Sequence, residues 1–258
     1  MNILKRISAS IFTILLLLCF TLSVQAMQEQ TSGSFPALDK KGAPIIINGS
    51  EVTLEWRKVT GWEMALDFFQ QILPVKAEAF ADESLNFLDD TFQVKKEYSV
   101  AVTDYYKEDP KALDAQIEAA KQDRKVRVDF TLQIEQQQVE MLKKIVQDQK
   151  VPLVEFFAVV AKNKKNEILG FTAFHINPEL VKGDVSLESL AIMPMFQGYG
   201  LARPLVFSIL KIVPDIKRIF LGTNIWLTKA QITYNALGFS VYAQESYGIK
   251  FEYLVKNN

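Results

Sequence analysis

The sequence predicts a mixed α/β fold with a helical segment in its middle, and three observations support this. Residues 153–258 alternate short apolar stretches of strand length with stretches whose apolar residues recur at helical spacing. Residues 86–150 are rich in Lys, Glu, Gln and Asp, which is typical of solvent-facing helices. One strand, ending at Pro194, leads through a glycine-containing turn into a helix.

The composition excludes several classes of function. The chain has 258 residues, of which 49% are hydrophobic and 23% charged, which is the usage of a globular protein. The 29 Lys and Arg nearly balance the 30 Asp and Glu, so we expect no nucleic-acid partner. The single Cys19 and the single His175 exclude a Cys-rich zinc site, a disulfide framework and a Cys/His nucleophile pair, and we predict no metal.

Residues 1–26 are predicted to be an export signal rather than part of the fold. Lys5 and Arg6 precede an apolar run from Ile11 to Val24, and small residues then permit cleavage after Ala26. Cleavage leaves a chain without Cys, which suits an oxidising compartment. The expected location is therefore periplasmic or secreted.

Three alternatives to cleavage remain open. A lipoprotein signal is disfavoured because Leu18, not a small residue, precedes Cys19. An uncleaved anchor is the only expected contact with a membrane, and its apolar run is near the lower limit of about 17 to 25 residues needed to span a bilayer. A translation start at Met27 makes the protein cytoplasmic.

After a polar, flexible leader at 27–44, residues 45–258 are predicted to form a single domain. Two short apolar stretches around Asn48-Gly49 predict an early hairpin. From Trp62 the apolar spacing becomes helical until Pro74 interrupts it, and a second helical piece is predicted to run on to about Asp90.

The helical stretch 86–150 is predicted to be an insertion into that domain. Asp109 and Pro110 supply an N-cap and a first-turn proline for one helix, and a longer helix passes through Ile134 and Val146.

The remaining residues, 153–258, are predicted to form the core of the site. The expected elements are strands at Leu153–Ala161, Ile168–Ile176, Val185–Ile192 and Arg218–Thr223, helices at about Tyr199–Ile212 and Thr228–Leu237, and final strands at Phe239–Ala243 and Lys250–Val255.

The turn after Pro194 is suited to an anion. The first backbone N–H groups of a helix have no partner within the helix and lie at the positive end of its dipole. Gly198 and Gly200 allow a phosphate to approach the backbone closely, and Pro204 fits the first helical turn. A glycine pair before a helix is equally compatible with an ordinary turn.

Two motifs together resemble the GNAT superfamily of acyl-CoA N-acyltransferases. The first is Leu-x-x-Leu-Ala-Ile-x-Pro at 187–194, followed by Gln-x-x-Gly-x-Ala at 197–202. The second is Ala-x-x-x-Tyr-x-x-Leu-Gly-Phe at 230–239. The resemblance is carried by residues 185–253, and it implies a mostly antiparallel central sheet flanked by helices, which opens where CoA enters.

The resemblance also implies roles for individual residues, with acetyl-CoA as co-substrate. The pantetheine arm is expected to pair with the strand at Leu190, Ala191 and Ile192. Glu188 corresponds to a carboxylate that deprotonates the amine, and alternation along the strand places it on the face of Leu190 and Ile192. Tyr234 corresponds to a tyrosine that protonates the departing thiolate. The pyrophosphate is expected against the backbone of Gln197, Gly198, Tyr199, Gly200, Leu201 and Ala202.

This chemistry needs neither a metal nor a covalent intermediate, because the amine attacks the thioester directly. Two departures from the family pattern affect the CoA contacts. Members often have Asn seven residues before the motif tyrosine, where this chain has Leu227, and more often Arg where it has Gln197.

Structural interpretations of the same residues remain open. Glu188 is also explained as a solvated or salt-bridged carboxylate, and Tyr234 as a residue that packs between helix and sheet. His175 is expected to be a strand residue rather than a base.

The sequence thus predicts transfer of an acetyl or other acyl group from acyl-CoA to a primary amine of a small molecule, a protein lysine or an N-terminus. Because acetyl-CoA is cytosolic, export and catalysis conflict, and three hypotheses resolve this. The enzyme is delivered into another cell's cytosol, or it is an exported non-catalytic binding module that acts through its cleft or helical insertion, or Met27 is the start of a cytoplasmic enzyme.

Overall fold

The computed structural model describes residues 31–59, 62–149, 155–176 and 181–256. The chain divides into two compact units, Met1–Gly33 and Ser34–Asn258, and the second contains almost all of these residues. The predicted export signal at 1–26 and its cleavage point lie outside the described residues. Among the helices that are described, none combines the length and the apolar character needed to cross a membrane.

The main sheet has eight strands in the order β1-β4-β5-β6-β7-β8-β10-β9, and β2 and β3 form a separate two-stranded ribbon. The strands are β1 Ser32–Pro36, β2 Ile46–Ile47, β3 Ser50–Glu51, β4 Thr53–Val59, β5 Glu155–Lys162, β6 Ile168–Ile176, β7 Asp184–Ile192, β8 Arg218–Asn224, β9 Ser240–Gln244 and β10 Gly248–Leu254.

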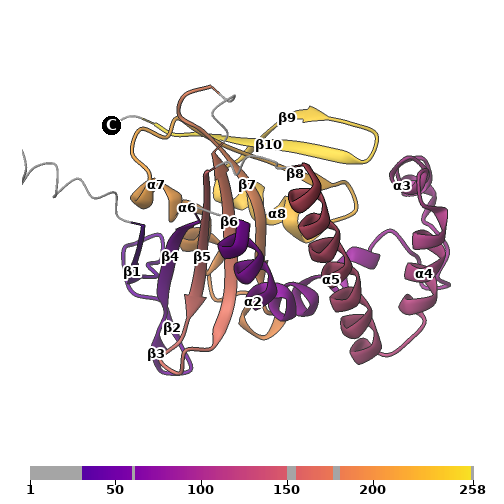
Figure 1. Cartoon of the computed structure of the whole chain (residues 1–258), viewed down its shortest axis with the longest axis horizontal. Helices are drawn as coiled ribbons and strands as arrows, with labels where there is room; N and C mark the ends of the chain where they lie inside the picture. The colour runs from indigo at the N-terminus through magenta and orange to yellow at the C-terminus, as the bar shows by residue number, and fades with distance from the viewer. Residues whose placement is uncertain (1–30, 60–61, 150–154, 177–180, 257–258) are drawn as a thin grey trace, which may run out of the picture. The chain divides into compact units, whose positions relative to one another are not determined.

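The sheet is mostly antiparallel, and the parallel pair of β7 and β8 shapes the site. β4 to β7 pair antiparallel in chain order, and β8, β10 and β9 form a second antiparallel group. β7 and β8 join the two groups in parallel through only three residue pairs, Asp184–Ser186 with Arg218–Phe220. β7 continues beyond Ser186 to Ile192, so the two groups separate there (Figure 1). The predicted fold class is confirmed.

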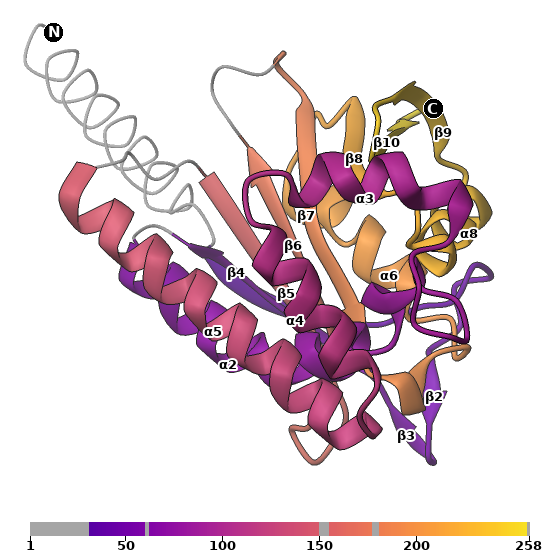
Figure 2. The same cartoon turned by 90° about the vertical axis from the view of Figure 1, so that its right-hand side faces the viewer.

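Helices cover both faces of this sheet. α2 packs on β4, β6 and β7, and α5 lies along α2 on the side away from the sheet (Figure 2). α6 packs on β5, β6 and β7 from the opposite face. The helices are α2 Trp62–Phe80, η1 Glu83–Leu85, η2 Lys96–Tyr98, α3 Ser99–Tyr106, α4 Pro110–Ala120, α5 Arg124–Gln149, η3 Pro194–Phe196, α6 Ala202–Phe207, α7 Ile209–Ile212 and α8 Thr228–Leu237.

Each face of the sheet has its own apolar core. Burying each large side chain there stabilises the fold by about 1.5 to 3 kcal/mol. The α2 face buries Ala65, Phe68, Ile72, Phe156, Phe171 and Ala173, and the α6 face buries Leu54, Val159, Phe174, Leu187, Leu205 and Ile219, among others.

A third apolar cluster ties the helical stretch to the loop that precedes α8. Phe87 and Val102 are buried there against Trp226, whose ring lies 5.7 Å from that of Phe87. Leu227, at the start of α8, packs against the same cluster. The residues that lead into the second motif helix are therefore held by the segment predicted to be an insertion.

The helical stretch 86–150 contains the predicted helices, whereas the prediction for the preceding helix, α2, is wrong at Pro74. The Asp109 side chain caps α4 by accepting a hydrogen bond from the Ala112 N–H at 3.2 Å, and α5 is the predicted long helix. Pro74, however, does not interrupt α2, which ends at Phe80. Proline in a helix interior costs about 3 kcal/mol, and buried residues on both sides of it, Ile72 and Val75 among them, keep the helix against the sheet.

The predicted flexible leader also contains structure. Residues 32–36 form the edge strand β1, in which Phe35 packs against the core on the α6 face. The Lys211 ammonium lies 4.8 Å from the centre of the Phe35 ring. A single aromatic residue in an otherwise polar stretch gives no periodic signal, so the sequence does not predict this strand.

Candidate functional site

The point at which β7 and β8 separate is fixed by an ionic cluster. Asp184 is only 6% exposed and accepts a hydrogen bond from Arg218 Nε at 3.0 Å, with Arg218 Nη2 also in contact. Arg218 Nη1 reaches Glu252 Oε2 on β10 at 3.4 Å. These bonds hold the first residues of β7 and β8 to the end of β10, and the rest of β7 is free of β8.

Glu188 lies at a β-bulge in β7. Ala173 pairs with Ser189 and Phe174 with Leu187, so Glu188 is the extra residue. A bulge breaks the strict period of two, and Leu187 and Leu190 pack against the same core although they are three positions apart. The alternation that predicts a shared face for Glu188, Leu190 and Ile192 therefore fails at this strand.

Glu188 contacts His175, which is a residue of β6 as expected. His175 Nδ1 and Glu188 Oε1 are 3.3 Å apart, and the Glu188 side chain is 45% exposed. The other ring nitrogen of His175, Nε2, is buried and has no hydrogen-bond partner within the described part of the chain. The structure thus gives Glu188 an imidazole neighbour, which is compatible both with a base and with an ion pair.

A pocket of about 520 Å³ lies where β7 leaves β8. It combines the end of β7, the glycine loop, α8 and the end of α2. Glu188 and Tyr199 are not among its lining residues, and the Tyr199 side chain is 49% exposed. The predicted site residues that line it are Leu190, Ala191, Ile192, Gln197, Gly198, Gly200, Leu201, Ala202 and Tyr234.

The loop between η3 and α6 has the geometry of an anion cradle. Gly198 and Gly200 have φ values of +83° and +81°, which L side chains rarely adopt, and a Cβ on either would meet no other atom within 4 Å. No backbone N–H from Gly198 to Leu201 donates to a backbone carbonyl in the described chain. Gln197 Nε2 ties the loop to the end of β7 by donating to the Ile192 carbonyl at 3.1 Å. Open space and free amides fit a phosphate group.

Tyr234 belongs to both the core and the pocket. It is 7% exposed, and its ring lies 5.7 Å from that of Phe239 and 5.8 Å from that of Phe251. Burial, with a further contribution from the negative charge of Glu83, raises the pKa of the Tyr234 phenol well above its ordinary value. The phenol is therefore protonated at neutral pH, as a proton donor must be.

Sequence reasoning missed the contribution of α2 and η1 to this pocket. Ala79, Phe80 and Glu83 line it, and Glu83 Oε1 accepts a hydrogen bond from the Ala230 N–H at 3.2 Å. Burial raises the pKa of the Glu83 carboxyl. Glu83 and Ala230 are 147 positions apart, so no local pattern joins them.

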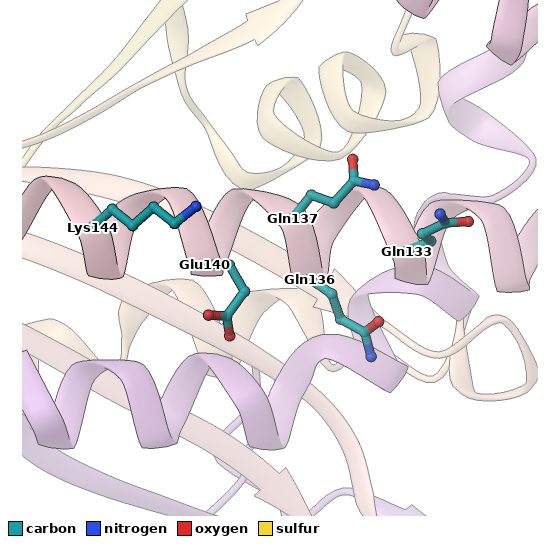
Figure 3. A pocket seen from close by; sticks show the side chains of 5 residues that line it. All are labelled: Gln133, Gln136, Gln137, Glu140 and Lys144. Carbon is teal, nitrogen blue, oxygen red and sulfur yellow. The ribbon is translucent and has the colours of Figure 1, made fainter.

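A second hollow lies along α5. It is lined by polar side chains of that helix alone; Gln136 and Glu140 project to one side and Gln137 and Lys144 to the other (Figure 3). None of its lining residues is a Cys, Ser, Thr or His. In the described ranges, no group of three or more Cys, His, Asp or Glu is placed to hold a metal ion.

Residues 120–239 match the family model described as Acetyltransferase (GNAT) family. This match covers both motifs and supports the assignment to the GNAT superfamily. A search of curated proteins finds no match.

Comparison with solved structures finds several acetyltransferases. Nourseothricin acetyltransferase is 14% identical, with a TM-score of 0.35 over 38% of this chain and 64% of its own, so this chain spans less than two thirds of it. The PaiA N-acetyltransferase from Thermoplasma acidophilum, solved with coenzyme A, is 14% identical, with a TM-score of 0.42 over 78% and 99%. A mutant of spermidine N-acetyltransferase from Vibrio cholerae is 18% identical, with a TM-score of 0.35 over 46% and 73%.

Proposed function

We propose that this chain is an N-acetyltransferase, which moves an acetyl group from acetyl-CoA to a primary amine. The observation that carries the proposal is one pocket in which the free end of β7, the glycine loop and Tyr234 meet. The fold and the family match on residues 120–239 support acyl transfer from acyl-CoA to an amine in general.

The residues that line the pocket match the chemical groups of CoA in their order along the molecule, from the pyrophosphate to the pantetheine arm. The free amides of the loop suit the pyrophosphate, and Arg203 and Lys229 add positive charge beside them. The segment Leu190–Ile192 has no β8 partner on one edge, so an extended pantetheine arm is able to add to β7 like a strand. The thioester of the bound acetyl-CoA supplies the activated acyl group.

The proposed reaction needs one base and one acid from the chain. Glu188, two residues along β7 from the pocket, accepts the proton that the amine must lose, directly or through water. The amine nitrogen then bonds to the thioester carbon, the bond from carbon to sulfur breaks, and Tyr234 donates its phenolic proton to the sulfur. The nitrogen, which still carries one proton more than the amide, gives that proton back to Tyr234, directly or through water, and Glu188 releases its proton to solvent, so the products are an amide and free CoA.

The acceptor and the location are also proposals. We propose an amine of a small molecule, a protein lysine or an N-terminus as acceptor, and no nucleic acid. An export signal at residues 1–26 requires delivery into another cell's cytosol, where acetyl-CoA is present. Because cleavage after Ala26 also leaves Met27 first, cell fractionation is needed beside mass spectrometry of the N-terminus. An exported chain that begins at Met27 is expected outside the cytoplasm, and a chain translated from Met27 is expected inside it.

A thermal-shift titration with acetyl-CoA tests the site. A ligand that binds only the folded state adds about 2.7 kcal/mol at a hundredfold excess over its Kd, which raises the Tm by about 5 to 10 °C. The double variant Gly198→Val/Gly200→Val is expected to abolish the shift. Its matched control is Gly42→Val/Gly49→Val, since both control glycines also have positive φ and open space but lie outside the pocket. No shift of the wild-type chain at millimolar acetyl-CoA would refute the proposal.

A further inference from the structure

The first turn of α8 lacks a side-chain cap from its own sequence. Leu227 is the N-cap residue, and its carbonyl accepts the first helical bond, from the Gln231 N–H at 3.2 Å. Its apolar side chain packs against the cluster around Phe87 and Trp226 and accepts no hydrogen bond. The N–H groups of the first turn of a helix need an acceptor from elsewhere.

Glu83 supplies that acceptor from a distant part of the chain. Its carboxylate accepts a hydrogen bond from Ala230, the third residue of α8, which is the position that an N-cap side chain ordinarily serves. A negative charge at this end of the helix also interacts favourably with the helix dipole. The Glu83 side chain is half-buried, so solvent screens this interaction only partly.

The elements around Glu83 hold it in this position. Its neighbour Asp82 is bound by Arg124 and Arg127 of α5, at 3.1 Å and 2.7 Å, and Arg124 also pairs with Glu78 of α2 at 2.8 Å. Both arginines of the first turn of α5 are thus engaged by these other carboxylates. These ion pairs hold the end of α2 against α5, and Glu83 contacts α8 instead.

Glu83 lies close to the group proposed as the acid. Tyr234 is one helical turn beyond Ala230 on α8, and Glu83 and Tyr234 line the same pocket. The other charged side chains that line this pocket are Arg203 of α6 and Lys229 of α8.

We propose that Glu83 is a positioning residue for Tyr234: its carboxylate caps α8 in place of Leu227 and fixes the helix that carries the phenol against the acyl-CoA pocket. This inference rests on the proposed function for the role of Tyr234, whereas the cap itself does not. It also assigns a role to the helical stretch, because α5 holds the segment that presents Glu83.

Amide hydrogen exchange at residues 228–232, followed by mass spectrometry of the full chain, tests the cap. Glu83→Ala is expected to speed exchange about fivefold, which corresponds to the roughly 1 kcal/mol that a helix cap contributes. Glu83→Ala/Leu227→Asn, in which asparagine restores a cap from within the helix, is expected to return exchange to the wild-type rate. The matched control is Glu97→Ala, at an exposed glutamate of η2.

The same variants test positioning through thiol release from acetyl-CoA, with a lysine-containing peptide, a polyamine and an amino sugar as acceptors. We expect Glu83→Ala to lower kcat about tenfold with little change in the KM for acetyl-CoA, because misplacement of a reacting group slows chemistry rather than binding. The Leu227→Asn change is expected to restore kcat.

Each other outcome overturns part of the proposal. Unchanged exchange in Glu83→Ala excludes the cap, and exchange that recovers without kcat shows that Glu83 acts through its charge and not by positioning. If the wild-type chain releases no thiol with any acceptor, the proposed function fails, while the exchange data still decide whether Glu83 caps α8.

Discussion

Replacing Tyr234 with phenylalanine separates its packing from its proposed chemistry. The ring is 7% exposed and packs against Phe239 and Phe251. Phenylalanine keeps these contacts and removes only the hydroxyl, so the Tm is expected to stay within about 2 °C of wild type. The affinity for acetyl-CoA is expected to change less than about threefold, because the pocket wall is retained.

The expected effect on turnover is much larger. Proton transfer by a positioned side chain contributes about a hundredfold to ten-thousandfold to a rate, so Tyr234→Phe should lower kcat at least about a hundredfold. Because burial and the charge of Glu83 raise the pKa of this phenol, wild-type turnover should show no loss from its ionisation near pH 10, where an exposed tyrosine titrates.

Thiol release from acetyl-CoA measures the turnover, and titration calorimetry measures the affinity. Tyr253→Phe is the matched control, since Tyr253 also packs against Phe239 but does not line the pocket. If Tyr234→Phe keeps wild-type kcat, Tyr234 is a packing residue and the proton must reach sulfur by another route. If it loses acetyl-CoA affinity and kcat in proportion, the hydroxyl acts in binding.

Three further predictions concern carboxylates. Glu188→Gln should lower kcat about a hundredfold in the same assay, and unchanged kcat would leave Glu188 as a partner of His175 only. Burial outweighs the hydrogen bond from Ala230 and raises the pKa of Glu83, so ionisation of this carboxyl lowers the stability of the fold as the pH rises from the ordinary value near 4.5 through the raised pKa, although the ionised group still accepts the Ala230 bond. Glu83→Gln should therefore flatten the fall of Tm above pH 4.5, and an unchanged Tm profile would contradict this. Asp184→Asn should lower the free energy of unfolding in urea by about 2 to 3 kcal/mol, because it leaves Arg218 without its main partner; a loss below about 0.5 kcal/mol would contradict that reasoning.

The parts of the site that the sequence predicts are those set by local chemistry. Gly198 and Gly200 are needed for positive φ in a loop that enters a helix, and Gly238 ends α8 in the left-handed conformation. Each of these depends on a few neighbouring residues. The strand, the glycine loop and the helix of Tyr234 were therefore predictable together from their motifs.

The parts that could not be predicted depend on contacts between distant residues. The bulge at Glu188 arises because β7 has one more residue than β6 over the paired region, and the sequence of neither strand alone reveals this. Pro74 remains inside α2 because the sheet offers an apolar surface to the helix on both sides of the proline. Glu83 is one carboxylate in an acidic stretch, and only the fold brings it to α8.

The start of α8 explains why the site depends on so distant a residue. A polar side chain at position 227 would cap the helix locally, but Leu227 instead packs with Trp226 into the cluster that holds Phe87. The apolar contact fastens the loop after β8 to the helical stretch, and it leaves the first turn of α8 without an acceptor. The same helical stretch, through α5 and the end of α2, presents Glu83 to that turn. The packing of Leu227 and the cap from Glu83 thus both depend on the helices that follow α2. A substitution that breaks the ion pairs of α5 with Asp82 is therefore expected to displace Tyr234, although it changes no residue that lines the pocket.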